Sequence, residues 1–524
     1  MPCSKSVLFH LKSPYNKSMK NTVYKSASIV TALSVAERGL GFLYRVVLSR
    51  LIGAEGLGLY QVALSLFSLF LTVGTGGIPI TVSRMISKSK AENDPLGERR
   101  AVSAGICLCL VLTLPFCLIL GAFGKHMTFL FSDERSFGVF RILLIGLACS
   151  SVYAVIRGSF WGNKEFLTPS ILEIAEETVM VIAGVLLLRS VPSPAVGAEK
   201  AAWAVVISYF FSFTASLLCF FFRGGKLSTP KTAFKPLFKA TMPITSVRAS
   251  GSLVNSAVAV LLPVMLIRAG AGKTEALRLF GIVSGMVLPV LFIPSTLIGS
   301  LSLVLVPELS EDFYRKNYAH LRKNLERGLS VSFLIACVLI PFFYALGEDI
   351  GRLAFSEAAA GKMIVKSSLV LLPMSVTMIS TSMLNSLGFE KQTFLFYFIG
   401  AAAMIVCILI LPPVCGVYAY IVGLGVSYIL TAVCNLVFLH KKGLIFQKNQ
   451  EQVCVRPLLL SLISILPLSV LGQAFCTLFK GFAGQSLAVV FSALALAAAC
   501  AVLYILLGII PIKKKNRRKN TAFS

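Results

Sequence analysis

The sequence predicts an all-α polytopic membrane protein, and three features support that fold class: hydropathy, the spacing of loop charges and an internal repeat. The 524 residues are 56% hydrophobic and 14% charged, with a mean hydropathy of +0.84. Soluble domains are about 25% charged. Long apolar runs, among them 59–73, 101–123 and 488–510, exclude a chain built around one soluble core.

About 20 apolar residues are needed to cross a bilayer as a helix. This criterion predicts about fourteen transmembrane helices, at 23–49, 58–83, 101–124, 137–161, 168–188, 201–222, 240–267, 279–306, 328–347, 363–386, 393–411, 417–439, 457–479 and 486–512. The first six form a predicted N-lobe (23–222). A basic cytoplasmic linker (223–239) joins it to a C-lobe of the next six (240–439). The last two helices (457–512) lie outside both lobes.

Lys and Arg are concentrated in alternate connecting segments, beginning with the polar and basic segment 1–22 and ending with the basic tail 513–524. Because cytoplasmic loops carry the excess of basic residues, both termini are predicted to lie in the cytoplasm. The first apolar run is long and contains Glu37 and Arg38, so we do not expect a removable signal peptide. The predicted location is therefore the cytoplasmic membrane.

The two lobes are predicted to be copies of one six-helix unit. Pro115-Phe116 recurs as Pro341-Phe342 at an offset of 226, and Gly162 recurs as Gly388 at the same offset. Six is an even number, so both copies enter the membrane in the same direction. Parallel repeats of this kind bind their substrate at the interface between them in transporters.

The first predicted span carries Glu37, Arg38 and Arg45 within an apolar segment. A charge near the bilayer centre costs about 3 kcal/mol on insertion scales, so such residues usually serve a function. Arg38 and Arg45 are seven residues apart and share one helix face, with Gly39 and Gly41 leaving that face uncrowded. We expect two stacked positive charges facing a polar cavity. The alternative is that Arg38 simply pairs with Glu37.

The seventh span carries a second polar face. Arg248, Ser252 and Asn255 recur at helical spacing, about twelve residues or more past Pro236. Arg248 and Asn255 are therefore further candidates for substrate binding, together with Arg38 and Arg45. Arginine suits a phosphate or pyrophosphate because its planar fork donates two hydrogen bonds. The alternative for Arg248 is a side chain that extends to the interface.

Acidic residues cluster at the start of the fifth span. Glu173 and Glu177 are one turn apart, so like charges repel unless a proton or cation intervenes. We consider Glu37, Glu173 and Glu177 for coupling to a proton or sodium ion, against a solvated helix N-terminus that favours acidic side chains. Arg157 is interpreted as an interfacial anchor, as are Arg141 and Lys366.

Proline falls inside the seventh and eighth spans, at Pro243, Pro263, Pro289 and Pro294. Interrupted helices in transporters bend and gate, and proline also makes static kinks; both interpretations stand equally here.

Several functional classes are disfavoured by composition. The 13 cysteines are scattered and the four histidines form no cluster, so we predict no disulfide, metal site or cofactor. No glycine-rich phosphate loop is present to couple ATP hydrolysis. The net charge of +27 comes mainly from loops, which favours contact with anionic membrane lipids and not nucleic acid.

Several motifs resemble a known family. They are the run Arg38-Gly39-Leu40-Gly41-Phe42 through Gly53-Ala54-Glu55-Gly56-Leu57-Gly58 to Tyr60, the motif Arg157-Gly158-x-Phe160-x-Gly162, and the run from Gly285 through Pro289 and Pro294 to Glu311. They are similar to the polysaccharide-transporter branch of the multidrug/oligosaccharidyl-lipid/polysaccharide (MOP) exporter superfamily. Within that branch, the stage V sporulation and lipid II flippase-like members are most similar. Trp161 and Glu177 depart from the residues expected there.

The resemblance implies two lobes, alternating access and a cargo of undecaprenyl-pyrophosphate-linked saccharide for peptidoglycan, the spore cortex or another envelope polymer. It assigns cavity arginines to Arg38 and Arg45. It implies a transporter and not an enzyme, with cell-wall or spore-envelope synthesis proteins as partners. Three alternatives stay open: an ion-coupled multidrug antiporter of the same superfamily, a membrane-bound glycan polymerase or transferase, and a non-transporting scaffold. The predicted outer loops are short for a polymerase or transferase.

Overall fold

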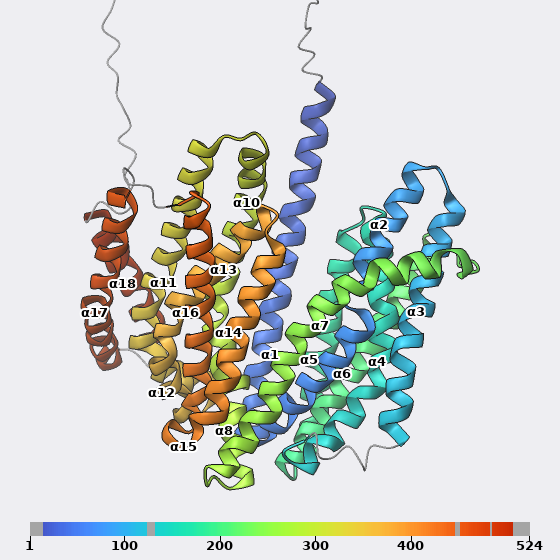
Figure 1. The fold of residues 1–524 in the computed structure, drawn as a ribbon. Helices are drawn as coiled ribbons and strands as arrows, with labels where there is room; N and C mark the ends of the chain where they lie inside the picture. Colours follow the sequence, from blue (N-terminus) through green and yellow to red (C-terminus); the bar gives the residue numbers. More distant parts are fainter. Residues whose placement is uncertain (1–13, 123–130, 446–450, 483–484, 507–524) are drawn as a thin grey trace, which may run out of the picture. The chain divides into compact units, whose positions relative to one another are not determined.

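The structure is a computed structural model that describes residues 14–122, 131–445, 451–482 and 485–506. Within these residues every regular element is a helix, which confirms the all-α class (Figure 1). The predicted tail 513–524 and the first residues of the segment 1–22 lie outside the described residues.

The chain divides into two compact units. Unit 1 comprises residues 1–52 and 62–256, and unit 2 comprises 53–61 and 257–524. The helices up to the unit boundary are α1 (Pro14–Thr75), α2 (Ile78–Ala91), α3 (Pro95–Ala122), α4 (Glu134–Gly162), α5 (Leu167–Leu187), α6 (Pro194–Phe222) and α7 (Lys231–Arg268).

The elements that follow belong to unit 2. They are α8 (Lys273–Gly281), a π-helical turn (Ile282–Val287), α9 (Leu288–Leu291), α10 (Ile293–Tyr314), α11 (Tyr318–Phe355), α12 (Ala358–Ser367), a 3₁₀ turn (Ser368–Val370), α13 (Leu371–Ser386), α14 (Glu390–Ile410), α15 (Pro412–Cys415), α16 (Tyr418–Lys441), α17 (Glu451–Phe482) and α18 (Gln485–Leu506).

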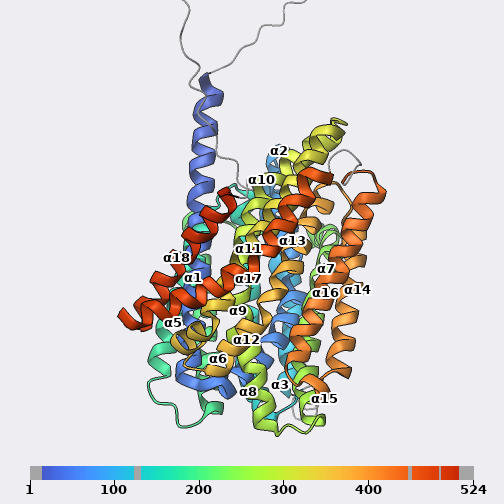
Figure 2. The same ribbon diagram turned by 90° about the vertical axis from the view of Figure 1, so that its left-hand side faces the viewer.

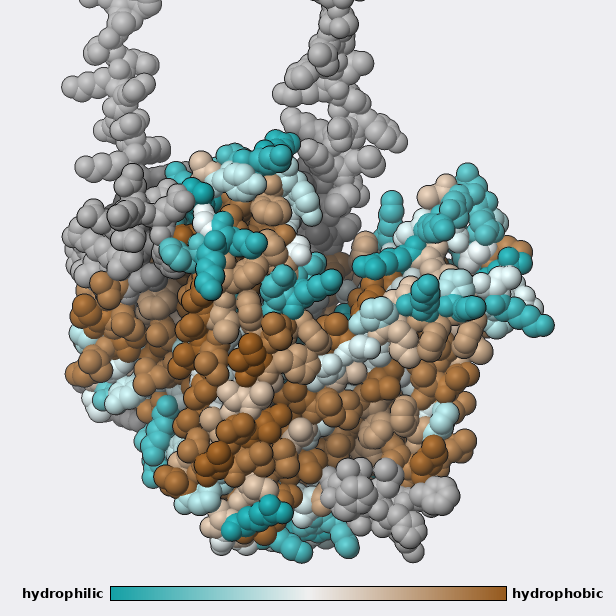
Figure 3. Space-filling view, in the orientation of Figure 1, coloured by the Kyte–Doolittle hydropathy of each residue, from teal (hydrophilic) through white to brown (hydrophobic). Residues whose placement is uncertain are grey.

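Among the described residues, twelve helices are long and apolar enough to cross a membrane, so the chain is a multi-pass membrane protein. The difference from fourteen has physical causes. The first two predicted spans form one continuous run, and the eighth is split in two. The fifth, α5, carries three glutamates, and the last contributes only a shorter apolar helix at Leu487–Cys500. Figure 3 shows hydrophobic side chains over the middle of the helices and hydrophilic ones towards their ends.

The predicted outer loop 50–57 is wrong in extent. Helical backbone continues through it, and Gly53 alone departs from it, with φ 69° and ψ 178°. That positive φ is costly for any residue with a Cβ, so glycine permits the kink without strain. The other residues of the segment are compatible with a helix, so the interruption is confined to Gly53.

Residues 53–61 belong to unit 2 because they pack closely on α8. A Cβ built on Gly58 would lie 2.0 Å from the carbonyl oxygen of Leu277, and one built on Gly281 would lie 2.0 Å from that of Ala54. Leu57 is fully buried and lies against Gly285. The glycines of this sequence motif therefore allow two backbones to touch.

In unit 1, helices α2, α3, α4 and α6 surround one apolar core. The start of α7 also contributes to it, through the buried side chains of Ala233 and Leu237. The segment 231–239, predicted as part of a linker, is therefore the first part of α7. The boundary between the units falls later, after Ser256.

In unit 2, the eighth predicted span is interrupted, as its prolines indicate. The π-helical turn precedes α9, whose second residue is Pro289, and α10 has Pro294 at the same position. By contrast, α7 runs unbroken past Pro243 and Pro263. Helices α17 and α18 pack together and against α11 (Figure 2).

Candidate functional site: a charged cluster inside unit 1

The charged face of the first span lies on the part of α1 that belongs to unit 1. The Arg38 side chain is exposed, whereas Glu37 and Arg45 are half-buried. A Cβ on Gly39 would have no neighbour within 4 Å, and one on Gly41 would meet only the Glu177 carboxylate, 3.7 Å away. The uncrowded face predicted at Gly39 and Gly41 is therefore present, and Glu177 of α5 lies beside it.

The strongest contact in the cluster is an ion pair between α4 and α5. Arg157 Nη1 donates to Glu173 Oε1 at 2.7 Å, and the two side chains are only 30% and 20% exposed. The guanidinium also stacks on two rings of its own helix, 5.8 Å from the centre of Tyr153 and 5.0 Å from that of Trp161. Arg157 is thus held on an interior face, and the prediction of an interfacial anchor is replaced by this ion pair.

Four carboxylates and three guanidinium groups interact electrostatically here. Glu37 interacts with Glu173, Arg157 and Arg38. Glu177 interacts with Glu37 and Arg45. Glu176 lies near Ser212 of α6 and interacts with Arg157 and both neighbouring glutamates. Helices α1, α4, α5 and α6 therefore bring their polar side chains together.

The cluster is not fully satisfied. Glu176 Oε2, Glu177 Oε2 and Arg157 Nε are buried and have no hydrogen-bond partner among the described residues. A buried polar atom without a partner costs about 1–3 kcal/mol, and more when charged. Such atoms in a membrane protein are candidates for binding a proton, an ion or a substrate group.

Small residues set the spacing of the helices that carry the cluster. A Cβ on Gly158 would lie 2.5 Å from the carbonyl oxygen of Pro79, so α4 approaches α2 through the motif that includes Arg157. On the other side, a Cβ on Gly184 would lie 2.5 Å from the ring of Tyr44. The glycines thus hold α4 against α2 and α5 against α1, where the charges meet.

Arg248 and Asn255 lie in the part of α7 that belongs to unit 1, and both side chains are exposed. Two serines on the same side of the predicted polar face form hydrogen bonds within unit 1. Ser252 hydrogen-bonds Thr72 at 2.9 Å, and Ser256 donates to the carbonyl oxygen of Ser65 at 2.7 Å. No hydrogen bond or ion pair of Arg248 or Asn255 occurs among the described residues.

The structure therefore brings together Glu37, Glu173 and Glu177 with Arg45. The sequence places Glu176 between Glu173 and Glu177, but sequence reasoning did not include it among the coupling candidates and interpreted Arg157 as an interfacial anchor. The signal for Glu176 was present, because three glutamates in one apolar helix are unusual. Among the described residues, no group of three or more His, Cys, Asp or Glu side chains is arranged to hold a metal ion.

Comparison with known proteins defines the family. A model described as polysaccharide biosynthesis protein matches residues 23–313, more than half of the chain. Stage V sporulation protein B of Bacillus subtilis (strain 168) is 26% identical over 355 residues, covering 65% of this chain and 68% of that protein. Lipid II flippase MurJ of the same organism is 25% identical over 345 residues. That match covers 60% of this chain and 63% of MurJ, less than two thirds of its length.

Solved structures share the fold. A lipid II flippase MurJ in an inward closed conformation matches with a TM-score of 0.69 and 15% identity, covering 91% of this chain and 99% of that one. An inward-facing multidrug resistance MATE family transporter of the MOP superfamily matches with a TM-score of 0.65 and 13% identity, covering 77% and 94%. The chain therefore belongs to the polysaccharide biosynthesis protein family.

Proposed function

We propose that the chain is a flippase, which moves an undecaprenyl-pyrophosphate-linked saccharide across the cytoplasmic membrane by alternating access between its two lobes. The observation that carries the proposal is a group of arginines within the apolar helices of a polysaccharide biosynthesis protein. The relatives named stage V sporulation protein B and lipid II flippase MurJ support a cargo for the cell wall or the spore cortex. Transport, and not catalysis, is the proposed activity.

Arg38 and Arg45 bind the pyrophosphate in this proposal. Two planar guanidinium groups on one face match the two phosphates of the carrier lipid, and each donates a pair of hydrogen bonds. The open space beside Gly39 leaves room for a polar headgroup. Arg248 and Asn255, exposed on α7, bind the same substrate at another stage of the transport cycle. The polyprenyl chain stays in the surrounding lipid.

Glu37, Glu173 and Glu177 couple binding to a proton or a sodium ion in this proposal. The positive charge of Arg45 acts on Glu177 in the structure. When Arg45 turns to the pyrophosphate, Glu177 loses that neutralising charge beside Glu37 and takes up a proton or cation. Substrate release then returns Arg45 to Glu177 and favours loss of the ion. We further propose that both termini face the cytoplasm, where the cargo enters.

Transbilayer movement of lipid II in proteoliposomes tests the arginine assignment. We expect Arg38→Ala and Arg45→Ala each to slow movement by roughly 10- to 100-fold, the cost of losing a hydrogen bond to a charged group. Arg45→Lys should retain part of the rate because it keeps the charge but not the paired donors. Arg189→Ala, an exposed arginine outside the cluster, is the matched control. Normal movement in both alanine variants would exclude these residues as the binding site.

A second candidate function, an ion-coupled multidrug antiporter, is favoured by one observation: carboxylates outnumber guanidinium groups in the unit 1 cluster. Acidic residues suit cationic drugs, so the two functions depend on opposite charges. Drug efflux that survives Arg38→Ala but is lost in Glu37→Gln would support the antiporter. The flippase proposal predicts instead that Arg38→Ala slows lipid II movement by the roughly 10- to 100-fold given above.

A further inference from the structure

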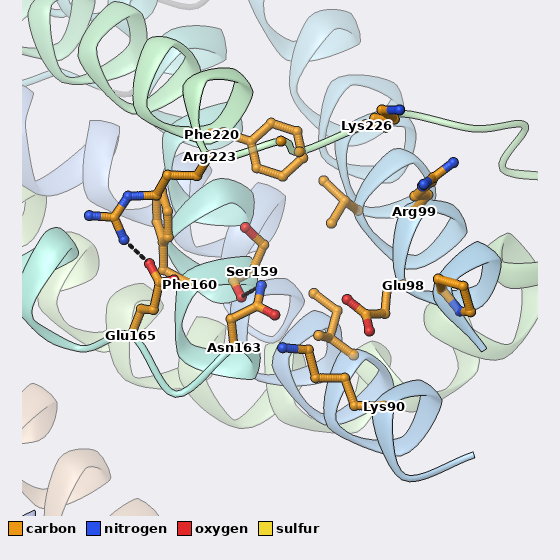
Figure 4. Close-up of a pocket in the computed structure, with 15 residues that line it drawn as sticks. Lys90, Glu98, Arg99, Ser159, Phe160, Asn163, Glu165, Phe220, Arg223 and Lys226 are labelled. Carbon is orange, nitrogen blue, oxygen red and sulfur yellow. Dashed lines mark hydrogen bonds and ion pairs between the residues drawn. The ribbon is translucent and has the colours of Figure 1, made fainter. Parts of the chain in front are cut away.

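A polar cavity lies in unit 1 at the end of the helices predicted to face the cytoplasm, and its lining includes no residue of the charged cluster. It has a volume of about 370 Å³ and is enclosed by the end of α2, the start of α3 and the ends of α4 and α6 (Figure 4). Ile86, Val102, Phe160 and Phe220 form its apolar walls. Sequence reasoning assigned no role to this place.

Two helix ends build the cavity in the same way. After α6, Gly225 N donates to the carbonyl oxygen of Phe220 at 2.9 Å and Gly224 N to that of Phe221 at 2.9 Å, with Gly224 at φ 79°. After α4, the same pair of bonds forms from Glu165 N to Phe160 and from Lys164 N to Trp161, at 2.9 and 3.0 Å. These Schellman caps fix the connections that follow.

The connection after α6 is tied down further. Ser228 N donates to Ser103 Oγ of α3 at 2.9 Å, which holds the segment with Lys226 over the cavity. On the α4 side, Asn163 Nδ2 donates to the carbonyl oxygen of Ser159 at 2.9 Å. The lining is therefore a built structure and not a gap between loose loops.

The lining is positively charged. Four cations, Lys90, Arg99, Arg223 and Lys226, face two carboxylates, Glu98 and Glu165. Arg223 is ion-paired with Glu165 and stacks on the ring of Phe160, 5.8 Å from its centre. Lys90, Arg99 and Lys226 make no ion pair with any described residue. In Figure 4, Lys90 and Glu98 extend into the cavity beside Asn163, and Arg99 and Lys226 lie together at one edge.

Exposed apolar side chains flank this charged opening. Phe221 and Phe222, which precede Arg223, are 51% and 86% exposed. Leu227, next to Lys226, is 49% exposed, and Leu96 of α3 is 42% exposed. Aromatic and aliphatic side chains beside cations are typical of the membrane interface, where the headgroups of lipids lie. The surroundings of the cavity thus favour a ligand held in the bilayer over one free in water.

We propose that this cavity binds the headgroup of an anionic phospholipid that carries hydroxyl groups, such as phosphatidylglycerol. Arg99 and Lys226 take the phosphate at the edge, because basic pockets on the cytoplasmic side suit anionic headgroups. Glu98 and Asn163 accept hydrogen bonds from the headgroup hydroxyls inside. The exposed Phe221 and Phe222 contact the acyl chains.

Native mass spectrometry of the full-length protein tests this, with titration of short-chain phosphatidylglycerol, short-chain phosphatidylcholine or inorganic phosphate. We expect tight binding of one phosphatidylglycerol and weak binding of the other two. At about 1 kcal/mol per basic residue, Lys226→Gln should weaken phosphatidylglycerol binding about fivefold and the pair Arg99→Gln/Lys226→Gln about thirtyfold. Lys88→Gln removes an exposed lysine near the cavity that does not line it, and is the matched control.

Three results would overturn the proposal: equal binding of phosphatidylglycerol and phosphatidylcholine, equal binding by Lys226→Gln and Lys88→Gln, or inorganic phosphate that binds as tightly as the lipid. The last would assign the cavity to a soluble anion. Lys226 is exposed in the connection after α6, so its replacement should leave the fold intact. If the double variant Arg99→Gln/Lys226→Gln does not fold, lipid binding by Lys226→Gln alone tests the proposal. Lipid II movement is measured separately, so this proposal fails or holds independently of the flippase assignment.

Discussion

The interiors of the two units differ in their chemistry. In unit 1, α4 and α5 contribute Arg157, Glu173, Glu176 and Glu177 to a charged cluster. In unit 2, α13 contains no charged residue, and α14 has only Glu390 and Lys391, at its first turn. The residue 226 positions after Arg157 is Met383, which is 1% exposed in the apolar core of unit 2.

The polar contacts between α13 and α16 of unit 2 are neutral. Asn435 of α16 is fully buried, and its Nδ2 donates to Ser380 Oγ at 3.0 Å and to Thr381 Oγ1 at 3.1 Å. Thr377 donates to the carbonyl oxygen of Tyr428 at 2.7 Å. These contacts hold α13 and α16 together without any ion pair. This pair of helices therefore needs no interior charge for its stability, which favours a functional reason for the charges that α4 and α5 carry in unit 1.

Replacing the ion pair of unit 1 by apolar residues should have the largest effect on the comparison. Glu173→Leu leaves Arg157 without its partner and should lower the free energy of unfolding by about 2–3 kcal/mol, somewhat less than for a fully buried pair. The double variant Arg157→Met/Glu173→Leu should recover part of that stability, because neither member of the ion pair is left without the other. Both variants should lose lipid II movement. Denaturant unfolding in detergent and the proteoliposome assay measure the two effects.

The double variant removes the ion pair between α4 and α5, so that these two helices meet without one, as α13 and α16 of unit 2 do. If it transports at the normal rate, the charges of unit 1 are structural and the comparison has no functional meaning. If it is no more stable than Glu173→Leu, the loss in the single variant comes from poor packing and not from the unpaired guanidinium group.

The glycine contact of unit 2 should give the next largest effect. Gly58→Ala places a methyl group where the carbonyl oxygen of Leu277 lies, so α8 must move; we expect a loss of about 1–3 kcal/mol. The control is Gly299→Ala on α10, where a Cβ meets nothing within 4 Å and alanine is the better helix former. Thermal unfolding of both variants measures this. Equal melting temperatures would show that residues 53–61 do not depend on the contact.

Local patterns in the sequence predicted much of the fold. Apolar runs gave the helices, the prolines at 289 and 294 gave the interruption before α10, and the two glycines beside Arg38 gave an uncrowded face. Each of these features depends on residues close together in the chain, where helical spacing decides which side chains share a face.

Features that depend on packing between helices were missed. The spacing of α4 alone cannot show that Arg157 meets Glu173, because the pair depends on how α4 and α5 pack. The segment 50–57 was predicted as a connection between the first two spans, yet only Gly53 leaves the helix, and the neighbouring Gly58 is needed for contact with α8. A glycine that makes a turn and one that allows close packing look the same in a sequence.

The smallest effect is expected for a substitution in unit 2, at Asn435. Asn435 gives two hydrogen bonds, but its Oδ1 is buried without a partner, so the net contribution of its amide is small. Asn435→Leu removes the two donated hydrogen bonds together with the unpartnered oxygen. It should change the free energy of unfolding by about 1 kcal/mol or less, with lipid II movement unchanged. Thr377→Val, which removes one hydroxyl donor from the same helix pair, is the matched variant for stability. Loss of movement in Asn435→Leu at normal stability would show that polar residues inside unit 2 also take part in transport, and the functional contrast between the units would then be wrong.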